Sequence, residues 1–291
     1  MRLHLIDGTY ELFRAHYSPR PGHESPTGQD LKATVGVVAS LLSLLHDATE
    51  DVTHIAVAFD NPIRSFRNDL YPFYKSDEGV EPALRAQFDT VEEGVRAIGV
   101  AVWSMKDHEA DDGLAAGAAR FRDEVDQVRI MTPDKDLGQC IRGTRVVQVD
   151  RRQMKTTDEA AFRERRGFAP QSMADYLALT GDTADGFPGL PGFGEKTAGM
   201  LIGAYEHLEA IPLDASQWKV KPRGAAQLVA TFAERREEAF LYRKLATLAE
   251  DAPVATSLDE VRFRGVERAR FEAWCRAVGT TTLATMPRRW A

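Results

Sequence analysis

Short apolar runs alternate with stretches of helical periodicity along the first half of the chain. The apolar runs predict buried strands at residues 3–6, 55–59, near 100, 128–131 and 145–149. The intervening stretches predict helices at residues 9–17 and 31–46, after Asp111 and from Asp134, with a loop rich in Pro and Gly at 18–30. Such a β/α alternation is typical of a mainly parallel sheet flanked by helices, which is an α/β fold.

The alternation stops near residue 150, and the pattern beyond it predicts mainly helices. We therefore divide the chain into an α/β core at residues 1–165 and a helical region at residues 166–291. A chain of 291 residues is long enough for one large α/β domain with a helical extension of this kind.

Nine acidic residues gather in five short clusters, and three of these clusters directly follow or closely follow an apolar run. Asp7 and Asp60 end the first two runs, and Asp134 and Asp136 come just after the run at 128–131. The carboxyl ends of the strands in an open parallel sheet share one edge, so side chains placed there converge on one crevice. We expect these acids to meet at such an edge.

The remaining two clusters pair acidic residues that are three positions apart. One contains Glu109, Asp111 and Asp112, and the other contains Asp182 and Asp185. On a helix this spacing puts both members of a pair on one face. An isolated Asp after a strand can also be a simple helix N-cap, and Asp7, Asp111 and Asp134 are open to that reading. Capping alone does not explain clusters of the form Glu-x-Asp-Asp or Asp-x-Asp.

So many carboxylates in one place favour a metal site, because close like charges repel and raise each other's pKa. Oxygen ligands select Mg²⁺ or Mn²⁺ over zinc. The seven His residues are scattered, and Cys140 and Cys275 lie far apart in sequence. Two ions about 3.5–4 Å apart can hold the attacking and leaving oxygens of a phosphoryl displacement and activate a water. The pattern therefore predicts phosphodiester hydrolysis with two or more Mg²⁺ or Mn²⁺ ions.

Several motifs carry a family resemblance, and they run in the family's order over roughly the first 210 residues. They are Leu-Ile-Asp-Gly at 5–8, Ala-Phe-Asp at 58–60, Ser-Phe-Arg at 65–67, Tyr-Lys at 74–75, Glu-Ala-Asp-Asp at 109–112, Thr-Pro-Asp-Lys-Asp-Leu at 132–137, and the stretch 180–198. With these motifs the chain resembles the bacterial and phage 5′ nuclease family. These flap endonucleases also form the 5′ nuclease domain of bacterial DNA polymerase I.

The resemblance implies a PIN-like 5′ nuclease core with a helical arch around residues 63–90, through which a 5′ single strand passes. It implies that Arg67 and Lys75 are catalytic cations that face the scissile phosphate. Phe73 and Tyr74 could stack on an unpaired base. The alternative is a mobile surface loop anchored by ordinary aromatic residues. The family usually continues with basic residues after Lys75, whereas this chain has Ser-Asp-Glu-Gly at 76–79.

The Gly-rich stretch that follows Asp185 indicates a helix-hairpin-helix at residues 186–207. Gly192 and Gly194 would let the backbone approach a phosphate, and the next helix would add donors at Lys196 and Thr197. A tight Gly/Pro turn between two packed helices is the alternative. The resemblance also implies a K⁺ ion held by carbonyls around Leu190 and Phe193.

The net charge of −7 argues against a nucleic-acid binder when it is taken for the whole chain. The acids, however, concentrate in the predicted metal site, where bound cations reverse the local field. Basic stretches at 219–223, 235–236, 243–244 and 262–276 could follow phosphates, although such runs are often solvated helix faces. We find no signal peptide, no membrane-spanning run and only two Cys, and we expect a cytoplasmic, free-standing nuclease without a polymerase domain.

Taken together, we predict a monomeric flap endonuclease and 5′-3′ exonuclease that acts in replication and repair on DNA with a 5′ flap, a nick or a 5′ end. Two alternatives stay open, a PIN-type ribonuclease and a non-catalytic binder of branched DNA. Residues 5–9 superficially match the Asp-x-Asp-Gly-Thr motif of haloacid-dehalogenase phosphatases. Leu5 occupies the nucleophile position of that motif, which excludes aspartyl-phosphate chemistry there.

Overall fold

A computed structural model describes all 291 residues, and the chain forms two compact units. The first unit consists of Met1–Ser65, Asp77–Thr132 and Glu250–Ala291, and the second consists of Phe66–Ser76 and Pro133–Ala249. The units are interleaved along the chain. They therefore do not coincide with the predicted domains 1–165 and 166–291, and that boundary stays a prediction.

The first unit is built on four parallel strands in the order β3-β2-β1-β4. They are β1 (Arg2–Asp7), β2 (His54–Asp60), β3 (Ala101–Met105) and β4 (Gln127–Met131). Every residue of β2 is buried, as expected of a strand whose two faces are both covered by helices. The predicted strands at 3–6, 55–59, near 100 and 128–131 are confirmed.

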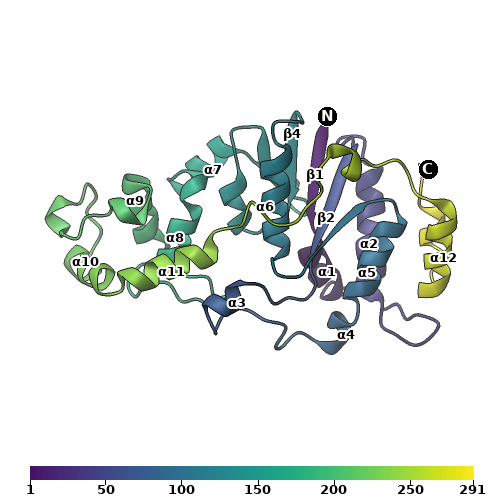
Figure 1. Cartoon of the computed structure of the whole chain (residues 1–291), viewed down its shortest axis with the longest axis horizontal. Coiled ribbons are helices and arrows are strands. Elements are labelled where there is room, and N and C mark those ends of the chain that lie inside the picture. The colour runs from purple at the N-terminus through teal and green to yellow at the C-terminus, as the bar shows by residue number, and fades with distance from the viewer. The chain divides into compact units, whose positions relative to one another are not determined.

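Helices cover both faces of this parallel sheet. Figure 1 shows α6 on one side of β1 and β2, with α2 and α5 on the other. The helices of the first unit are α1 (Gly8–His16), α2 (Lys32–Leu45), α4 (Pro82–Arg85), α5 (Phe88–Ala97), α6 (Ala110–Phe121) and α12 (Arg268–Val278), with short 3₁₀ helices η5 (Leu258–Val261) and η6 (Leu283–Thr285). The predicted helices at 9–17, at 31–46 and after Asp111 are confirmed.

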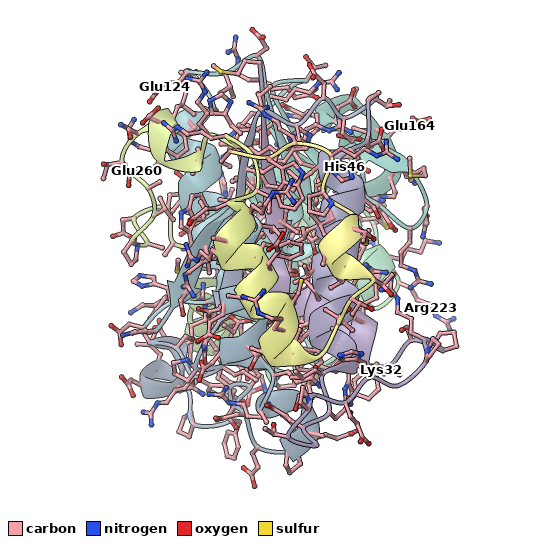
Figure 2. All side chains as sticks on the ribbon, turned by 90° about the vertical axis from the view of Figure 1, so that its right-hand side faces the viewer. Lys32, His46, Glu124, Glu164, Arg223 and Glu260 are labelled. Atoms are coloured by element: carbon pink, nitrogen blue, oxygen red, sulfur yellow. The ribbon has the colours of Figure 1, made fainter.

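The C-terminal segment packs on the helices of the first unit. Trp274 of α12 donates from its indole nitrogen to the carbonyl of Thr90 on α5 at 3.4 Å. The backbone amide of Arg288 donates to the His46 ring at the end of α2 at 3.1 Å. Figure 2 shows this segment, in yellow, from the side on which it covers α2 and α5. Residues 250–291 therefore pack within the first unit.

The second unit is mainly helical. It contains α3 (Arg67–Leu70), α7 (Glu159–Arg166), α8 (Met173–Thr180), α9 (Glu195–Tyr205), α10 (Ala225–Glu234) and α11 (Arg236–Ala246), the 3₁₀ helices η1 (Asp136–Cys140), η2 (Pro170–Ser172), η3 (Leu208–Ala210) and η4 (Ala215–Gln217), and the antiparallel strands β5 (Val146–Asp150) and β6 (Lys155–Thr157). Its core includes stacked rings of Phe187 and Tyr242, with centroids 5.6 Å apart. None of the chain's helices has both the length and the apolar character that a membrane crossing requires.

Two local predictions for the second unit were wrong. The helix expected from Asp134 is only the five-residue 3₁₀ helix η1. The side chain of Asp134 accepts a hydrogen bond from the amide of Asp136 at 2.9 Å, and this local bond replaces the start of an α-helix. Asp182 and Asp185 do not lie on a helix, because α8 ends at Thr180 and is followed by Gly181, whose φ is +79°. They lie in a turn closed by two backbone hydrogen bonds between Asp182 and Phe187, at 2.8 and 3.0 Å.

The segment predicted to be a helical arch has little helix. Residues 63–90 contain the four-residue helices α3 and α4 and the first residues of α5. Glu81 precedes Pro82, which occupies the first turn of α4, where a missing backbone N–H costs nothing.

Candidate active site

Three of the predicted acids form a tight buried cluster in the second unit. Carboxylate oxygens of Asp136, Asp182 and Asp185 all lie within 4.8 Å of one another. Asp136 begins η1, and the other two occupy the turn after α8. The 3₁₀ helix η1 packs against α8, and this tertiary contact brings together residues that are far apart in sequence.

Two lysines approach this acidic cluster. The Nζ of Lys75 lies 2.9 Å from Oδ1 of Asp185, and the Lys75 amide donates to the Asp185 carbonyl at 3.0 Å. Lys135 forms a close ion pair with Asp182, and its Nζ lies 3.7 Å from Oδ1 of Asp136. Burial alone would lower the pKa of Lys135, but Asp136, Asp182 and Asp134 together raise it above its usual value. Lys135 was not among the predicted site residues, although its place between two acids of the Asp-Lys-Asp motif was a signal for it.

The carboxyl group of Asp136 has a strongly perturbed pKa. Its pKa is raised well above the usual range, first by burial and then by the charges of Asp134 and Asp185. Its Oδ1 atom is buried and has no hydrogen-bond partner. A buried carboxylate oxygen without a donor is costly unless a cation compensates it. This donor set of hard oxygens fits a divalent cation such as Mg²⁺ or Mn²⁺.

Asp7 and Asp60 lie at the carboxyl ends of two neighbouring strands in the first unit. Asp7 is the N-cap of α1, where Oδ1 accepts from the amide of Tyr10 at 2.8 Å and Oδ2 accepts from the hydroxyl of Thr132 at 3.0 Å. Oδ1 of Asp60 accepts from the amide of Ala110 at 2.7 Å. The capping interpretation of Asp7 is thus correct, and both carboxylates are held in fixed orientations at one edge of the sheet.

Glu109 and Asp112 form a capping box at the start of α6. Asp112 accepts from the amide of Glu109 at 2.9 Å, and Glu109 accepts from the hydroxyl of Ser65 at 2.7 Å. Both side chains are buried, whereas Asp111 is half-buried. In the second unit, Asp134 is exposed. The expectation that all nine acids share one crevice stays a prediction.

The structure contradicts the role predicted for Arg67. Its side chain is 1% exposed, and its guanidinium donates to the carbonyls of Leu245 at 2.7 Å and Thr247 at 2.9 Å. These carbonyls belong to the end of α11, where a cation satisfies backbone groups that have no partner within the helix. Arg67 therefore holds the second unit together and does not present its charge to a phosphate.

The two aromatic residues of the same segment differ sharply in exposure. Phe73 is 76% exposed, whereas Tyr74 is 4% exposed and packs in the core of the second unit. The predicted stacking of Tyr74 on an unpaired base was wrong, because its ring faces are covered by protein. The ring of Phe73 remains accessible for such a contact.

The predicted hairpin lies between α8 and α9. Gly192 has a φ of +88°, which favours glycine, and Gly194 is the N-cap of α9 with a φ of −77°. Gly192, Gly194 and Lys196 are exposed, and Thr197 is half-buried. The amide of Leu190 donates to the carbonyl of Leu179 at 2.9 Å, so the hairpin folds back on the end of α8. The start of α9 thus offers exposed amides and a positive helix end.

Comparison with known proteins identifies the family. Residues 2–167 match the family described as 5′-3′ exonuclease, N-terminal resolvase-like domain, and residues 168–269 match 5′-3′ exonuclease, C-terminal SAM fold. The chain belongs to the 5′-3′ exonuclease family. Membership confirms the predicted family, the PIN-like α/β core with a helical C-terminal part, and the class of enzyme, a nuclease.

Relatives of the family include bacterial DNA polymerases. DNA polymerase I of Bacillus caldotenax is 31% identical over 282 residues, which cover 96% of this chain and 31% of that protein. DNA polymerase I of Pseudomonas aeruginosa is 35% identical over 260 residues, which cover 88% of this chain and 28% of that protein. The chain spans less than a third of the length of these curated relatives.

Solved structures show the same fold at low sequence identity. The T5 D15 protein co-crystallised with metal ions aligns with a TM-score of 0.64 and 17% identity, covering 98% of this chain and all of that chain. The catalytic core of Rad2 in complex with DNA substrate aligns with a TM-score of 0.63 and 13% identity, covering 96% of this chain and 88% of that chain.

Proposed function

We propose that this protein is a metal-dependent, structure-specific nuclease that hydrolyses DNA near the junction of a 5′ single strand and a duplex. Family membership supplies the reaction class. The DNA complexes described for the T5 D15 flap endonuclease and for Rad2 support DNA as the substrate. We propose that this DNA carries a 5′ flap, a nick or a 5′ end. We propose that it acts as a cytoplasmic monomer in replication and repair.

The observation that carries this proposal is the buried cluster of Asp136, Asp182 and Asp185. Three carboxylates lie within 4.8 Å of one another, with Lys75 and Lys135 beside them, and the buried Oδ1 of Asp136 has no hydrogen-bond partner. These residues would hold Mg²⁺ or Mn²⁺, together with Asp134. Asp7, Asp60, Glu109, Asp111 and Asp112 form the second set of candidate ligands. When bound, such ions activate a water and stabilise the leaving oxygen of the phosphodiester.

The side chains of the protein supply charge and orientation. We assign to Lys75, already paired with Asp185, the stabilisation of negative charge that develops on the phosphate. Phe73 would stack on an unpaired base. Gly192, Gly194, Lys196 and Thr197 would bind duplex phosphates, and carbonyls around Leu190 and Phe193 would hold K⁺. Expulsion of the 3′ oxygen leaves a 5′-phosphate and a 3′-hydroxyl on the products.

The test is cleavage of a 5′-labelled flap substrate in a titration of Mg²⁺ and Mn²⁺. Asp182→Asn and Asp136→Asn keep the side-chain volume but remove charge, and each should lower turnover by at least about 10²-fold while DNA binding is retained. Glu164→Gln, which removes an exposed carboxylate from α7, is the matched control and should cleave normally.

Three results would contradict the proposal. Full turnover in excess chelator would exclude the metal-dependent reaction. Tight binding of branched DNA without cleavage at any metal concentration would favour the non-catalytic binder. Preferential cleavage of single-stranded RNA would favour the PIN-type ribonuclease.

A further inference from the structure

A cavity of about 650 Å³ lies within the second unit, lined by the C-terminal end of α7, by α8 and by one face of α9. Its size is that of an ordinary ligand pocket, about 300–1,000 Å³. The lining includes the stacked rings of Phe168 and Tyr176, whose centroids are 5.0 Å apart. None of the acids of the candidate metal centre lines this cavity, which we call the α7–α9 pocket.

The wall of the α7–α9 pocket carries excess positive charge. Arg165, Arg166 and Lys196 line it, whereas Glu195 is the only acid in the lining. No carboxylate forms an ion pair with Arg165 or Arg166. By contrast Arg163, on the same helix, is paired with Glu159 at 2.9 Å.

Details of the two arginines point to an anion. The guanidinium of Arg166 lies 5.7 Å from the centre of the Tyr176 ring, and its Nε is buried without a hydrogen-bond partner. Burial and the charge of Arg166 lower the pKa of Arg165. Basic residues near a helix C-terminus also complement the helix dipole, but that effect leaves the buried N–H of Arg166 unsatisfied. An anion in the pocket would accept from it and would offset the repulsion between the two arginines.

Glycines on α9 keep the pocket open. A Cβ on Gly203 would come within 2.7 Å of the Gly167 carbonyl, so glycine is required there by the close approach of α7. A Cβ on Gly199 would meet only the Arg166 carbonyl, at an ordinary 3.7 Å. Packing of the two helices therefore does not require glycine at position 199, and its missing side chain leaves space in the pocket.

We propose that the α7–α9 pocket binds a phosphate group of the DNA backbone. Arginine presents a planar fork of donors that suits phosphate oxygens, and Lys196 adds a flexible positive charge. A second hollow of about 530 Å³ shares Gly203 and Ala204 with the pocket and adds one cation, Lys219, and one acid, Glu206, so the groove continues past the end of α9 without excess negative charge. This continuity favours a strand over an isolated nucleotide. The choice of DNA as the source of the phosphate rests on the proposed function.

The first experiment measures binding of flap DNA across a salt series, in chelator to prevent cleavage. The double variant Arg165→Ala/Arg166→Ala should bind about tenfold more weakly, and the slope of log affinity against log salt should fall by about two, since each lost phosphate contact removes about one released counterion. Arg163→Ala is the matched control, because its charge is paired with Glu159, and it should keep the slope of the unchanged chain.

The second experiment separates a pocket from a diffuse positive surface. Gly199→Leu keeps every charge but fills the cavity, and its binding should weaken to a similar degree. Circular dichroism melts check that each variant is folded. Unchanged affinity and slope in both the double variant and Gly199→Leu would overturn the proposal.

Titration with inorganic phosphate, followed by calorimetry, separates the two sources of phosphate. If inorganic phosphate binds through Arg165 and Arg166 but DNA binding does not depend on them, the pocket serves free phosphate compounds and the DNA assignment is wrong. Cleavage of flap DNA by the unchanged chain tests the proposed nuclease function independently of the affinity measurements that test the pocket. A chain that fails to cleave DNA but loses DNA affinity in both pocket variants would refute the nuclease proposal and leave the pocket proposal standing.

Discussion

At the scale of residues, Arg67 and Lys75 show how two cations of one segment come to have different tasks. Their sequence context predicts the same role for both. Arg67 is instead buried against carbonyls that are 178 and 180 residues away, and no local pattern encodes such a contact. Lys75 pairs with Asp185 and stays partly exposed. The acidic clusters could be recognised in the sequence because the members of each cluster lie within three residues of one another, whereas the meeting of Asp136 with Asp182 and Asp185, like the burial of Arg67, depends on tertiary packing.

This difference predicts opposite outcomes for two alanine variants. Lys75→Ala should lower kcat more than it raises KM and should leave the melting temperature nearly unchanged. Arg67→Ala should destabilise the fold by about 1–3 kcal/mol, because the carbonyls of Leu245 and Thr247 lose their donors. Steady-state kinetics on flap DNA and thermal melts measure both effects. Wild-type turnover by Lys75→Ala at saturating substrate would remove Lys75 from the catalytic step.

At the scale of elements, the strands were easier to predict than the connections between them. A strand buried on both faces is mostly apolar, and β2, in which every residue is buried, follows that rule. The three-residue strand β6 is too short and too polar to give a signal. The turn that holds Asp182 and Asp185 follows from Gly181, whose positive φ of +79° ends α8 and overrides the helical spacing of the two acids.

The hairpin between α8 and α9 offers a test with little penalty for folding. At Gly194 the backbone φ is ordinary and a Cβ would meet no atom within 4 Å, so Gly194→Val should fold normally. If the backbone approaches a phosphate there, the branched side chain should weaken duplex binding several-fold. Gly192→Val is the contrasting variant, since its φ of +88° adds strain and should lower the melting temperature. Equal DNA affinity of Gly194→Val and the unchanged chain across a salt series would remove the hairpin from the binding surface.

At the scale of the whole molecule, an internal charge network links two strands of the parallel sheet. His4 of β1 and Arg129 of β4 are partners in the strand register, and both contact Glu50, at 3.0 Å in each case. The hydrogen bond with His4, followed by the charge of Arg129, outweighs the effect of burial and lowers the pKa of Glu50 to about 2. The folded state therefore favours the ionised form of the Glu50 carboxyl group.

The sign of this shift predicts the acid side of the stability profile. A carboxyl whose pKa is lower in the folded state than in the unfolded state stabilises fully above the unfolded pKa of 4.5 and loses that contribution as the pH falls through about 2. Urea unfolding between pH 7 and pH 2 should show this loss, up to about 3 kcal/mol from Glu50 alone. Glu50→Gln should be less stable at pH 7 and should depend less on pH in this range. If the free energy of unfolding changed with pH in the same way for Glu50→Gln and for the unchanged chain, Glu50 would not be the source of this pH dependence.

The interleaved course of the chain has a consequence for its synthesis. The first unit needs Glu250–Ala291 as well as the N-terminal strands, and the second unit is completed earlier along the chain, at Ala249. Multidomain chains usually fold from the N-terminus as they emerge from the ribosome. Here the parallel sheet begins first but acquires α12 only after the whole second unit has been synthesised, so the apolar side of α5 that meets Trp274 stays uncovered until then.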